Sequence, residues 1–408
     1  TSSECHRLRF APYSDHELFV LYHNLPIVHD GNPRVEVSRD QRFVRLDGEP
    51  VVITIDGNAP SSTLSETEIE NHSFRVIIIE NFSEWTPEIF EAIESLADEE
   101  FTMSVRVGSA TTSPFDLRGL RRFSERLLGL HVQNRIERSS YPAFAELSAL
   151  RGLYLRHRDI DDALVRAISR NRSLRQLQLE FAHLTSDGYE RLARMDSLRE
   201  LSLTYSSTTD EHLAILSRLS ELRVLDLAGT EITDHGLRHL ANLTELRSLD
   251  ISLNGLTDRG FVHLESLTEL RWLTLTGASM GDEGLSHLSR MTELRVLRLT
   301  GVSIDGSGLS YLSGASQLRE LVLSGTEIRD ANLAVLSNWP HLERLDLSRT
   351  SIGDDGLAHV ARLNELRELD LRNTAVTESA IRAFVEQHPR CRLSTRRRCD
   401  SSTETSTE

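Results

Sequence analysis

The sequence predicts an α/β solenoid, a fold in which short strands and short helices alternate and stack in one direction. The first observation is a 24-residue segment, LRVLDLAGTEITDHGLRHLANLTE at residues 222–245, which recurs in ten consecutive copies over residues 150–389 without an insertion. The second is the leucine spacing, which changes within a copy from alternation to helical periodicity. The third is length, because 408 residues exceed what one compact core usually holds.

One copy predicts a strand, a turn and a short helix. Leu225 and Leu227 alternate along the chain, which is typical of a strand with one buried face. Thr233 and Asp234 offer capping side chains, and leucines then follow at helical spacing, at Leu237, Leu240 and Leu243. A unit of this size cannot bury its leucines alone, so neighbouring copies are expected to stack around a continuous core.

The copies resemble the leucine-rich repeat family, whose pattern is L-x-x-L-x-L-x-x-N/C-x-L. The asparagine position departs from this pattern, because Asn254 stands in one unit and threonine in four others, Thr230, Thr326, Thr350 and Thr374. Threonine offers one hydroxyl in place of an amide, so we expect weaker bonding between successive turns. The Thr-x-Ile-x-Asp-x-Gly-Leu run at 230–237 resembles bacterial repeats of the ribonuclease-inhibitor-like and F-box-related kind. This resemblance implies a right-handed solenoid with a curved parallel sheet on the concave side and helices on the convex side.

The array is expected to continue towards the N-terminus in a less regular form. We predict an N-terminal cap at 1–50, degenerate repeats at 51–149, regular repeats at 150–389, a C-terminal cap at 390–399 and a disordered tail at 400–408. Strand-like runs at 51–55, 74–79 and 102–107 alternate with helix-like segments at 86–100 and 113–127. A separate N-terminal domain is the alternative. Residues 56–100 hold twelve acids and one arginine, which predicts a solvated negative face or a surface for a basic partner.

Composition excludes several chemistries. The chain contains no lysine, so a Walker-A lysine, a Schiff-base lysine and a lysine general base are all absent. A net charge of −16 disfavours nucleic acid, whose phosphates the protein would repel. Cys391 and Cys399 could pair or remain thiols, and no CxxC pair suits zinc. No apolar run reaches the roughly 18 residues of a membrane span, and no signal peptide opens the chain, which begins at Thr1. We expect a cytoplasmic monomer without a cofactor.

Two sets of side chains could carry chemistry. Histidines recur at one helical position, at His239, His263, His287 and His359, but helix axes about 8–10 Å apart keep the rings from converging on one zinc ion. Aspartates fall on adjacent strands, Asp226 beside Asp250 and Asp346 beside Asp370, at about the 4.8 Å strand spacing. A hydrolase that uses these pairs is one alternative. Aspartate is ordinary at this position of the family and could pair with Arg344, so we predict neither catalytic residues nor a metal site.

Charged residues also recur before and after the first leucine of each unit. The arginines that follow it are Arg151, Arg175, Arg199, Arg223, Arg247, Arg271, Arg295, Arg319 and Arg367. The glutamates that precede it are Glu221, Glu245, Glu269, Glu293 and Glu365. These two columns predict an ion ladder in solvent, in which an exposed pair contributes about 0–1 kcal/mol.

Large apolar and aromatic side chains recur at positions expected to face solvent on the sheet. The third, fifth and eighth positions of the units supply Trp272, Arg298, Val296, Val322 and Leu253, and a second patch of Tyr154, Phe181 and Tyr205. Exposed groups of this kind usually mark an interface, with tryptophan, tyrosine and arginine as frequent anchors. We therefore predict a non-catalytic scaffold that binds a protein partner. Two alternatives are a role that only shields the sheet, and a substrate-recognition subunit of a ubiquitin-ligase-like or effector assembly.

Overall fold

The computed structural model describes the backbone of residues 35–37, 43–46, 49–56, 76–80 and 102–107, and the backbone and side chains of residues 114–395. The chain divides into two compact units, Thr1–Gln178 and Leu179–Glu408. Strand β8 (Gln176–Glu180) spans the division between them. The predicted helix at 86–100, most of the acidic segment 56–100 and the tail at 400–408 lie outside the described residues.

The first unit contains a short antiparallel start followed by parallel strands. Its strands are β1 (Val35–Val37), β2 (Phe43–Leu46), β3 (Glu49–Asp56), β4 (Val76–Glu80), β5 (Thr102–Val107), β6 (Leu127–Val132) and β7 (Gly152–Arg156). Strands β1 to β3 pair antiparallel, and β3 to β7 pair in parallel. The strands predicted at 51–55 and 102–107 are thereby confirmed, and the strand predicted at 74–79 is confirmed from residue 76 onward.

Among the described residues of the first unit, the helical segments are η2 (Leu117–Phe123), η3 (Arg138–Glu146) and α4 (Asp162–Ile168). The helix predicted at 113–127 is therefore too long at both ends. It begins later because Asp116 is the N-cap residue, whose carboxylate accepts the backbone N–H of Arg118 at 2.9 Å. It ends earlier because strand β6 begins at Leu127.

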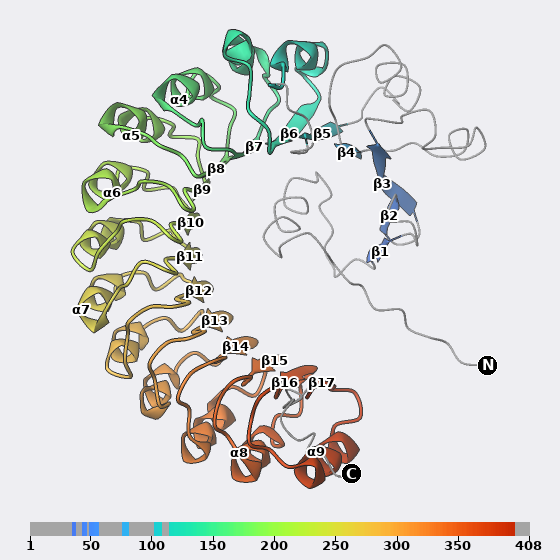
Figure 1. Cartoon of the computed structure of the whole chain (residues 1–408), viewed down its shortest axis with the longest axis vertical. Coiled ribbons are helices and arrows are strands. Elements are labelled where there is room, and N and C mark those ends of the chain that lie inside the picture. Colours follow the sequence, from blue (N-terminus) through green and yellow to red (C-terminus); the bar gives the residue numbers. More distant parts are fainter. Residues whose placement is uncertain are drawn as a thin grey trace, which may run out of the picture. The chain divides into compact units, whose positions relative to one another are not determined.

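The second unit repeats one strand and one helical segment every 24 residues. Its strands are β9 (Glu200–Ser202), β10 (Val224–Asp226), β11 (Ser248–Asp250), β12 (Trp272–Thr274), β13 (Val296–Arg298), β14 (Glu320–Val322), β15 (Arg344–Asp346), β16 (Glu368–Asp370) and β17 (Arg392–Ser394). All of them pair in parallel, in register with the repeat, so that Leu225 lies opposite Leu249. Within this unit the strands line the inner, concave side and the helices the outer, convex side (Figure 1). The predicted α/β solenoid is confirmed.

The helical segments of the second unit are short and of two types. The α-helices are α5 (Ser186–Leu192), α6 (Asp210–Leu216), α7 (Asp258–Phe261), α8 (Asp354–Val360) and α9 (Glu378–Gln387). The 3-10 helices are η4 (Gly236–Asn242), η5 (Val262–Leu264), η6 (Gly284–Leu288), η7 (Ser307–Leu312) and η8 (Asp330–Asn338). Leucine spacing of three residues in the repeat suits a 3-10 helix, in which residues i and i+3 lie directly above one another.

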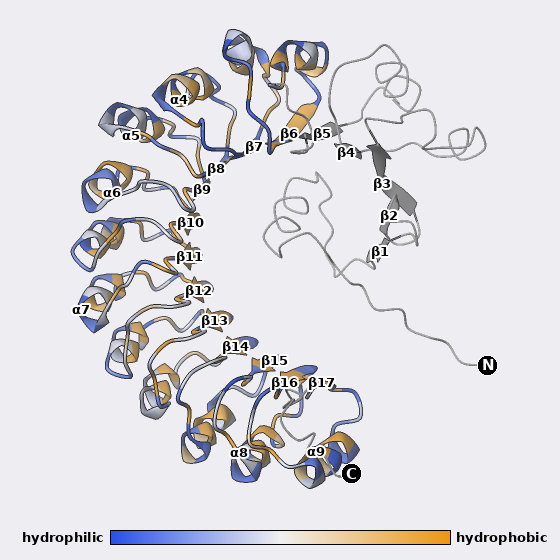
Figure 2. Cartoon of the chain, in the orientation of Figure 1, coloured by the Kyte–Doolittle hydropathy of each residue, from blue (hydrophilic) through white to orange (hydrophobic). Residues whose placement is uncertain are grey.

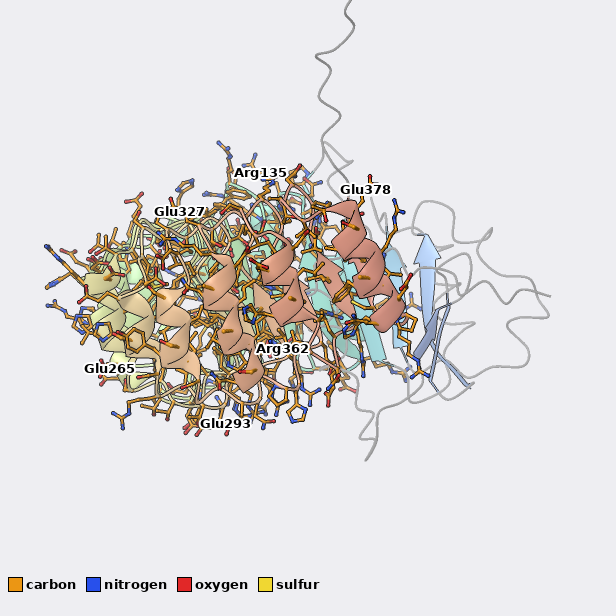
Figure 3. The ribbon with its side chains drawn as sticks, turned by 90° about the horizontal axis from the view of Figure 1, so that it is seen from below. Arg135, Glu265, Glu293, Glu327, Arg362 and Glu378 are labelled. Carbon is orange, nitrogen blue, oxygen red and sulfur yellow. The ribbon has the colours of Figure 1, made fainter. Side chains whose placement is uncertain are left out.

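The core lies between the strands and the helical segments. Five leucines of this repeat are 0% exposed: Leu225 in strand β10, Leu227 just after it, Leu237 and Leu240 in η4, and Leu243 at its C-cap. Both hydrophobic and hydrophilic residues lie on the helices, as expected for helices buried on one side (Figure 2). Charged side chains such as Glu265, Glu293 and Glu327 lie at the outer margin of the ribbon (Figure 3).

At the asparagine position, Asn254 forms more hydrogen bonds between repeats than threonine does, as the sequence predicts. Asn254 donates to the carbonyl of Leu227 in the preceding repeat at 2.8 Å and to that of Ile251 in its own repeat at 3.1 Å. Its side-chain oxygen accepts the backbone N–H of Thr230 at 2.8 Å. Thr326 instead donates only within its own repeat, to Leu323 O at 2.7 Å. Thr326 therefore completes one turn, whereas Asn254 also joins two repeats.

A column of aspartates, predicted from the sequence to cap helices, instead forms hydrogen bonds between repeats. Thr233 accepts the N–H of His235 at 3.2 Å, as a capping residue should. Asp234, however, accepts the N–H and hydroxyl of Thr257 in the following repeat, at 2.8 and 2.5 Å. We call the aspartates that bond forward in this way the aspartate ladder: Asp210, Asp234, Asp258, Asp282, Asp330 and Asp354.

The aspartate ladder explains the glycine of the Thr-x-Ile-x-Asp-x-Gly-Leu run. A Cβ atom built on Gly236 would lie 2.1 Å from Oδ1 of Asp210. The carboxylate of one repeat therefore occupies the space that a larger residue would need in the next.

Candidate functional site

The concave face of the second unit brings four of the predicted site residues together. Trp272 and Val296 lie opposite each other on strands β12 and β13, and Arg298 lies opposite Val322 on β13 and β14. All four side chains are partly exposed, while the leucines between them are buried. We call these residues, Trp272, Val296, Arg298 and Val322, the central patch. The alternation along each strand places them on the solvent side, as predicted.

Arg298 is held in place by ion pairing. Its Nε donates to Oε1 of Glu320 at 2.7 Å, and Nη2 lies 2.7 Å from the same oxygen. Arg344 reaches the other oxygen of Glu320 at 3.3 Å. The Glu320 side chain is only 12% exposed, so this carboxylate needs its two arginine partners more than a surface acid would.

The pairing continues along the concave face. Arg344 also lies 3.6 Å from Glu368, which in turn lies 3.8 Å from Arg392. We call these five residues, Arg298, Glu320, Arg344, Glu368 and Arg392, the concave ion ladder. The expectation that Arg344 pairs with a strand aspartate is wrong, because glutamates at the third position have longer side chains that reach it first. Glutamate and arginine alternate at 24-residue spacing in the sequence, which is the signal that could have identified this ladder.

The predicted column of arginines and glutamates forms in part. Arg199 lies 3.4 Å from Glu221 as expected. Arg319 and Arg367 instead both bind Glu343, at 2.5 and 3.2 Å. Glu343 takes the arginine position of its own unit, so it sits between two arginines.

The remaining predicted residues lie at the end of the strands, where the backbone turns. Phe181, Tyr205 and Leu253 occupy the eighth position of their repeats and have φ angles of 60°, 54° and 59°. The rings of Phe181 and Tyr205 stack with centroids 5.5 Å apart and planes 12° apart. Tyr205 and Leu253 are 47% and 51% exposed. We call Phe181, Tyr205 and Leu253 the edge row.

Tyr154 belongs to the first unit and lies on β7. Its ring meets that of His131 edge-on, with centroids 3.9 Å apart. Of the predicted second patch, Phe181 and Tyr205 therefore contact each other in the second unit, and Tyr154 contacts His131 in the first unit.

The paired strand aspartates accept hydrogen bonds from nearby backbone N–H groups. Asp226 lies in register with Asp250, and Asp346 with Asp370, as predicted. One oxygen of Asp226 accepts the N–H of Ala228 at 3.0 Å, and Asp250 accepts from Ser252 at 2.9 Å. Such a bond two residues along the chain is an Asx turn, which ends the strand.

Two of the recurrent histidines have partners of their own. His287 lies 2.7 Å from Glu265, and His239 accepts from Arg238 at 3.2 Å. Burial lowers the pKa of His239, which favours its neutral form. In the described part of the chain, no three His, Cys, Asp or Glu side chains are grouped so that they could hold a metal ion.

The C-terminal cysteines lie at the limit of the described residues. Burial raises the pKa of the Cys391 thiol. Cys399 lies outside the described residues, so the structure tests neither of the two alternatives, a disulfide or two thiols.

Comparisons with protein families match the repeats. A family model described as "Leucine rich repeat" matches residues 316–376, and a second of the same description matches residues 220–241 and 242–262. This chain is a leucine-rich repeat protein. Its resemblance to the ribonuclease-inhibitor-like and F-box-related kinds stays a prediction. Leucine-rich repeat folds commonly serve as scaffolds for protein interactions and are generally non-catalytic.

Solved structures with a similar fold include proteins of several kinds. An internalin from Listeria monocytogenes is 22% identical, with a TM-score of 0.49, over 74% of this chain and 88% of that chain. A leucine-rich repeat protein from Leptospira interrogans is 14% identical, with a TM-score of 0.43, over 84% and 94%. A chain from the octameric complex of Latrophilin 3, Unc5D and FLRT2 is 18% identical, with a TM-score of 0.44, over 72% and 89%. No curated protein matches the sequence significantly.

Among the described residues of this leucine-rich repeat protein, no helix is long and apolar enough to cross a bilayer. Strand alternation and repeat position predicted the residues of the central patch and the edge row. The concave ion ladder beside the central patch and the left-handed backbone beneath the edge row were not predicted.

Proposed function

We propose that this leucine-rich repeat protein is a non-catalytic scaffold whose concave face binds a protein partner. The observation that supports the proposal most is the edge row, because Tyr205 and Leu253 are about half exposed although both are large hydrophobic side chains. Apolar groups gathered on one face of a protein usually mark an interaction site. The central patch adds an indole ring and an arginine, residue types that often dominate binding energy.

The rigidity of the face favours binding. The strands of the second unit pair without interruption, so the positions of these side chains are set before a partner arrives. Arg298 is also fixed by Glu320, which reduces the side-chain freedom lost on binding. A preformed surface loses less conformational entropy when it associates.

Other parts of the proposal rest on the sequence. The net charge of −16 opposes nucleic acid as a partner. A bacterial origin, a cytoplasmic location, a monomeric state and the lack of a cofactor stay predictions. A hydrolase role for Asp226 and Asp250 is less favoured, because each carboxylate already accepts a backbone N–H of its own turn.

The proposal is tested by affinity capture from native lysate with three immobilised proteins. These are the wild type, the variant Trp272→Ala/Arg298→Ala, and the control variant Tyr311→Ala, which changes an aromatic residue on helix η7 that is 50% exposed. Circular dichroism first checks that all three are folded. Captured proteins are identified by mass spectrometry, then purified and titrated.

We expect the wild type and Tyr311→Ala to bind the same purified partner. Loss of two interface anchors should weaken binding by at least about tenfold in Trp272→Ala/Arg298→Ala. Equal binding by all three proteins would place the interface elsewhere and refute the proposed site. Turnover of a captured molecule that disappears in Asp226→Asn would refute the non-catalytic assignment.

A further inference from the structure

We propose that four arginines of the first unit, Arg151, Arg170, Arg172 and Arg175, bind an acidic segment of a partner protein. We call these residues the arginine cluster. The segment would carry glutamate or aspartate at alternate positions of an extended chain. This inference goes beyond the proposed function, because the cluster lies in a different unit from the central patch and the edge row. Its support comes from the distribution of charge, the geometry of one loop and the pairing of nearby acids.

Positive charge is concentrated in the part of the first unit whose side chains are described. Residues 114–178 contain thirteen arginines and seven acids, a net charge of +6, although the whole chain carries −16. Charges separated by more than about 8 Å are largely screened at physiological ionic strength. The acids elsewhere in the chain therefore do not cancel the local attraction of this region for an anion.

A buried asparagine fixes the loop that carries two of the arginines. Asn171 is 4% exposed and donates to the carbonyl oxygens of Phe144 and Leu147, at 3.0 and 2.7 Å. Arg170 and Arg172 flank it in the sequence, and both are exposed. The loop after helix α4 therefore holds these two side chains in solvent through contacts in which they take no part.

The other two arginines lie against the same loop. The backbone N–H of Arg175 donates to the carbonyl oxygen of Arg151 at 2.8 Å, just before strands β7 and β8 begin. Nη1 of Arg151 lies 3.5 Å from the carbonyl oxygen of Ser173, which follows Arg172 in the sequence. The guanidinium of Arg151 is thereby placed beside the backbone that carries Arg172.

The acids of this region are bound by other arginines. Arg121 lies 2.7 Å from Glu146, the acid 24 residues before Arg170, and Arg135 lies 3.3 Å from Asp159. Five of the seven acids are paired in this way with arginines outside the cluster: Asp116, Glu137, Glu146, Asp159 and Asp161.

Three arginines of the cluster have no such partner. In the described part of the chain, Arg170, Arg172 and Arg175 form no ion pair, and all three are exposed. Like charges held close together repel one another, so this arrangement does not favour folding. A bound carboxylate would offset the repulsion, and a guanidinium can bind both carboxylate oxygens at once.

A protein segment fits the cluster better than an anionic membrane does. The exposed large hydrophobic side chains among the described residues all lie in the second unit, so the cluster has none to insert between lipids. A membrane surface is also large enough to meet acids of the chain, which it repels. A short extended segment contacts only the cluster. Its alternate side chains lie about 7 Å apart on one face, so two carboxylates can reach different arginines.

The test uses the full chain and fluorescein-labelled peptides of about ten residues, long enough to place several carboxylates on one face. One peptide alternates glutamate with serine, and two matched peptides carry glutamine or arginine in place of glutamate. Fluorescence anisotropy measures their affinities at physiological and high salt. We expect the glutamate peptide to bind at least about tenfold more tightly than the glutamine peptide, with the preference reduced by salt.

Matched variants assign the binding to the cluster. Arg170→Gln/Arg172→Gln/Arg175→Gln should lower affinity for the glutamate peptide at least about tenfold. Its urea midpoint should be equal or higher, because the change removes repulsion between like charges. The control variant removes the same charge from three exposed arginines of the second unit and should preserve the affinity: Arg238→Gln/Arg259→Gln/Arg290→Gln.

The outcomes distinguish this inference from the proposed function. Equal binding of the glutamate and glutamine peptides, or equal loss in the test and control variants, overturns the inference. Binding to phosphatidylserine vesicles that the three-arginine variant loses, without peptide binding, would assign the cluster to a membrane and also overturn it. Trp272→Ala/Arg298→Ala should bind the glutamate peptide as tightly as the wild type while losing the partner of the concave face. Loss of the peptide in that variant would place it on the concave face instead, so either proposal can fail alone.

Discussion

Replacement of Asp282 by alanine should show how strongly the aspartate ladder holds neighbouring repeats together. The carboxylate of Asp282 accepts three backbone N–H groups of the next repeat, from Asp305 at 2.8 Å, Gly306 at 3.1 Å and Gly308 at 2.7 Å. Asp282→Ala would leave all three donors without this acceptor. At about 1 kcal/mol each, the lower end for unsatisfied amides because the loop is partly buried, the loss is about 3 kcal/mol.

Urea unfolding followed by circular dichroism measures this loss, and hydrogen exchange of residues 305–308 shows whether it is local. The ladder itself provides graded controls. Asp258 accepts two backbone N–H groups, from Gly281 and Gly284, and Asp330 accepts one, from Gly353. Alanine variants should therefore lose about 2 and about 1 kcal/mol. Equal losses of stability at the three aspartates, or losses in the reverse order, would refute the expectation that each accepted N–H group adds about 1 kcal/mol.

Three further changes test other contacts. Gly236→Ala places a methyl group 2.1 Å from Oδ1 of Asp210 and should destabilise by about 1–3 kcal/mol in urea unfolding. Asn254→Thr removes the bond donated to Leu227 O at 2.8 Å and the two accepted from Thr230, from its N–H at 2.8 Å and its hydroxyl at 3.0 Å, a loss of about 2–3 kcal/mol in the same assay. Burial lowers the pKa of His157 from 6.5, so the unfolded chain binds its proton more readily and stability should fall below about pH 6.5. His157→Leu should reduce that fall in urea midpoints measured from pH 8 to pH 5, and an unchanged pH profile would contradict the assignment.

The alternation of leucines predicted the strands of the second unit well because every repeat has the same core-facing positions within its own sequence. Leu225 and Leu227 are such positions, and both are fully buried once neighbouring repeats stack. The exposed third and fifth positions follow from the same alternation, so Trp272 and Arg298 were placed on the concave face without further information.

Contacts between repeats were harder to predict, because one unit of sequence does not show which side chain of the next unit it reaches. Asp234 has the sequence context of a helix cap, yet its partner is Thr257, 23 residues later. The left-handed backbone was also missed. Glycine recurs at the eighth position in four repeats, which is the signal that could have identified it, but Phe181, Tyr205 and Leu253 interrupt that pattern.

The aspartate ladder has a direction, and this gives the array a polarity in assembly. Each aspartate accepts donors from the repeat that follows it, as Asp210 does from Thr233 and Asp354 does from Thr377. A repeat leaving the ribosome therefore meets an acceptor already folded behind it, since synthesis proceeds from the N-terminus. Shortening the array from its C-terminal end exposes carboxylates, which water solvates readily. Shortening it from the N-terminal side leaves the backbone N–H groups of the first remaining turn without their acceptor. The array should therefore tolerate truncation at its C-terminal end better than at its N-terminal end.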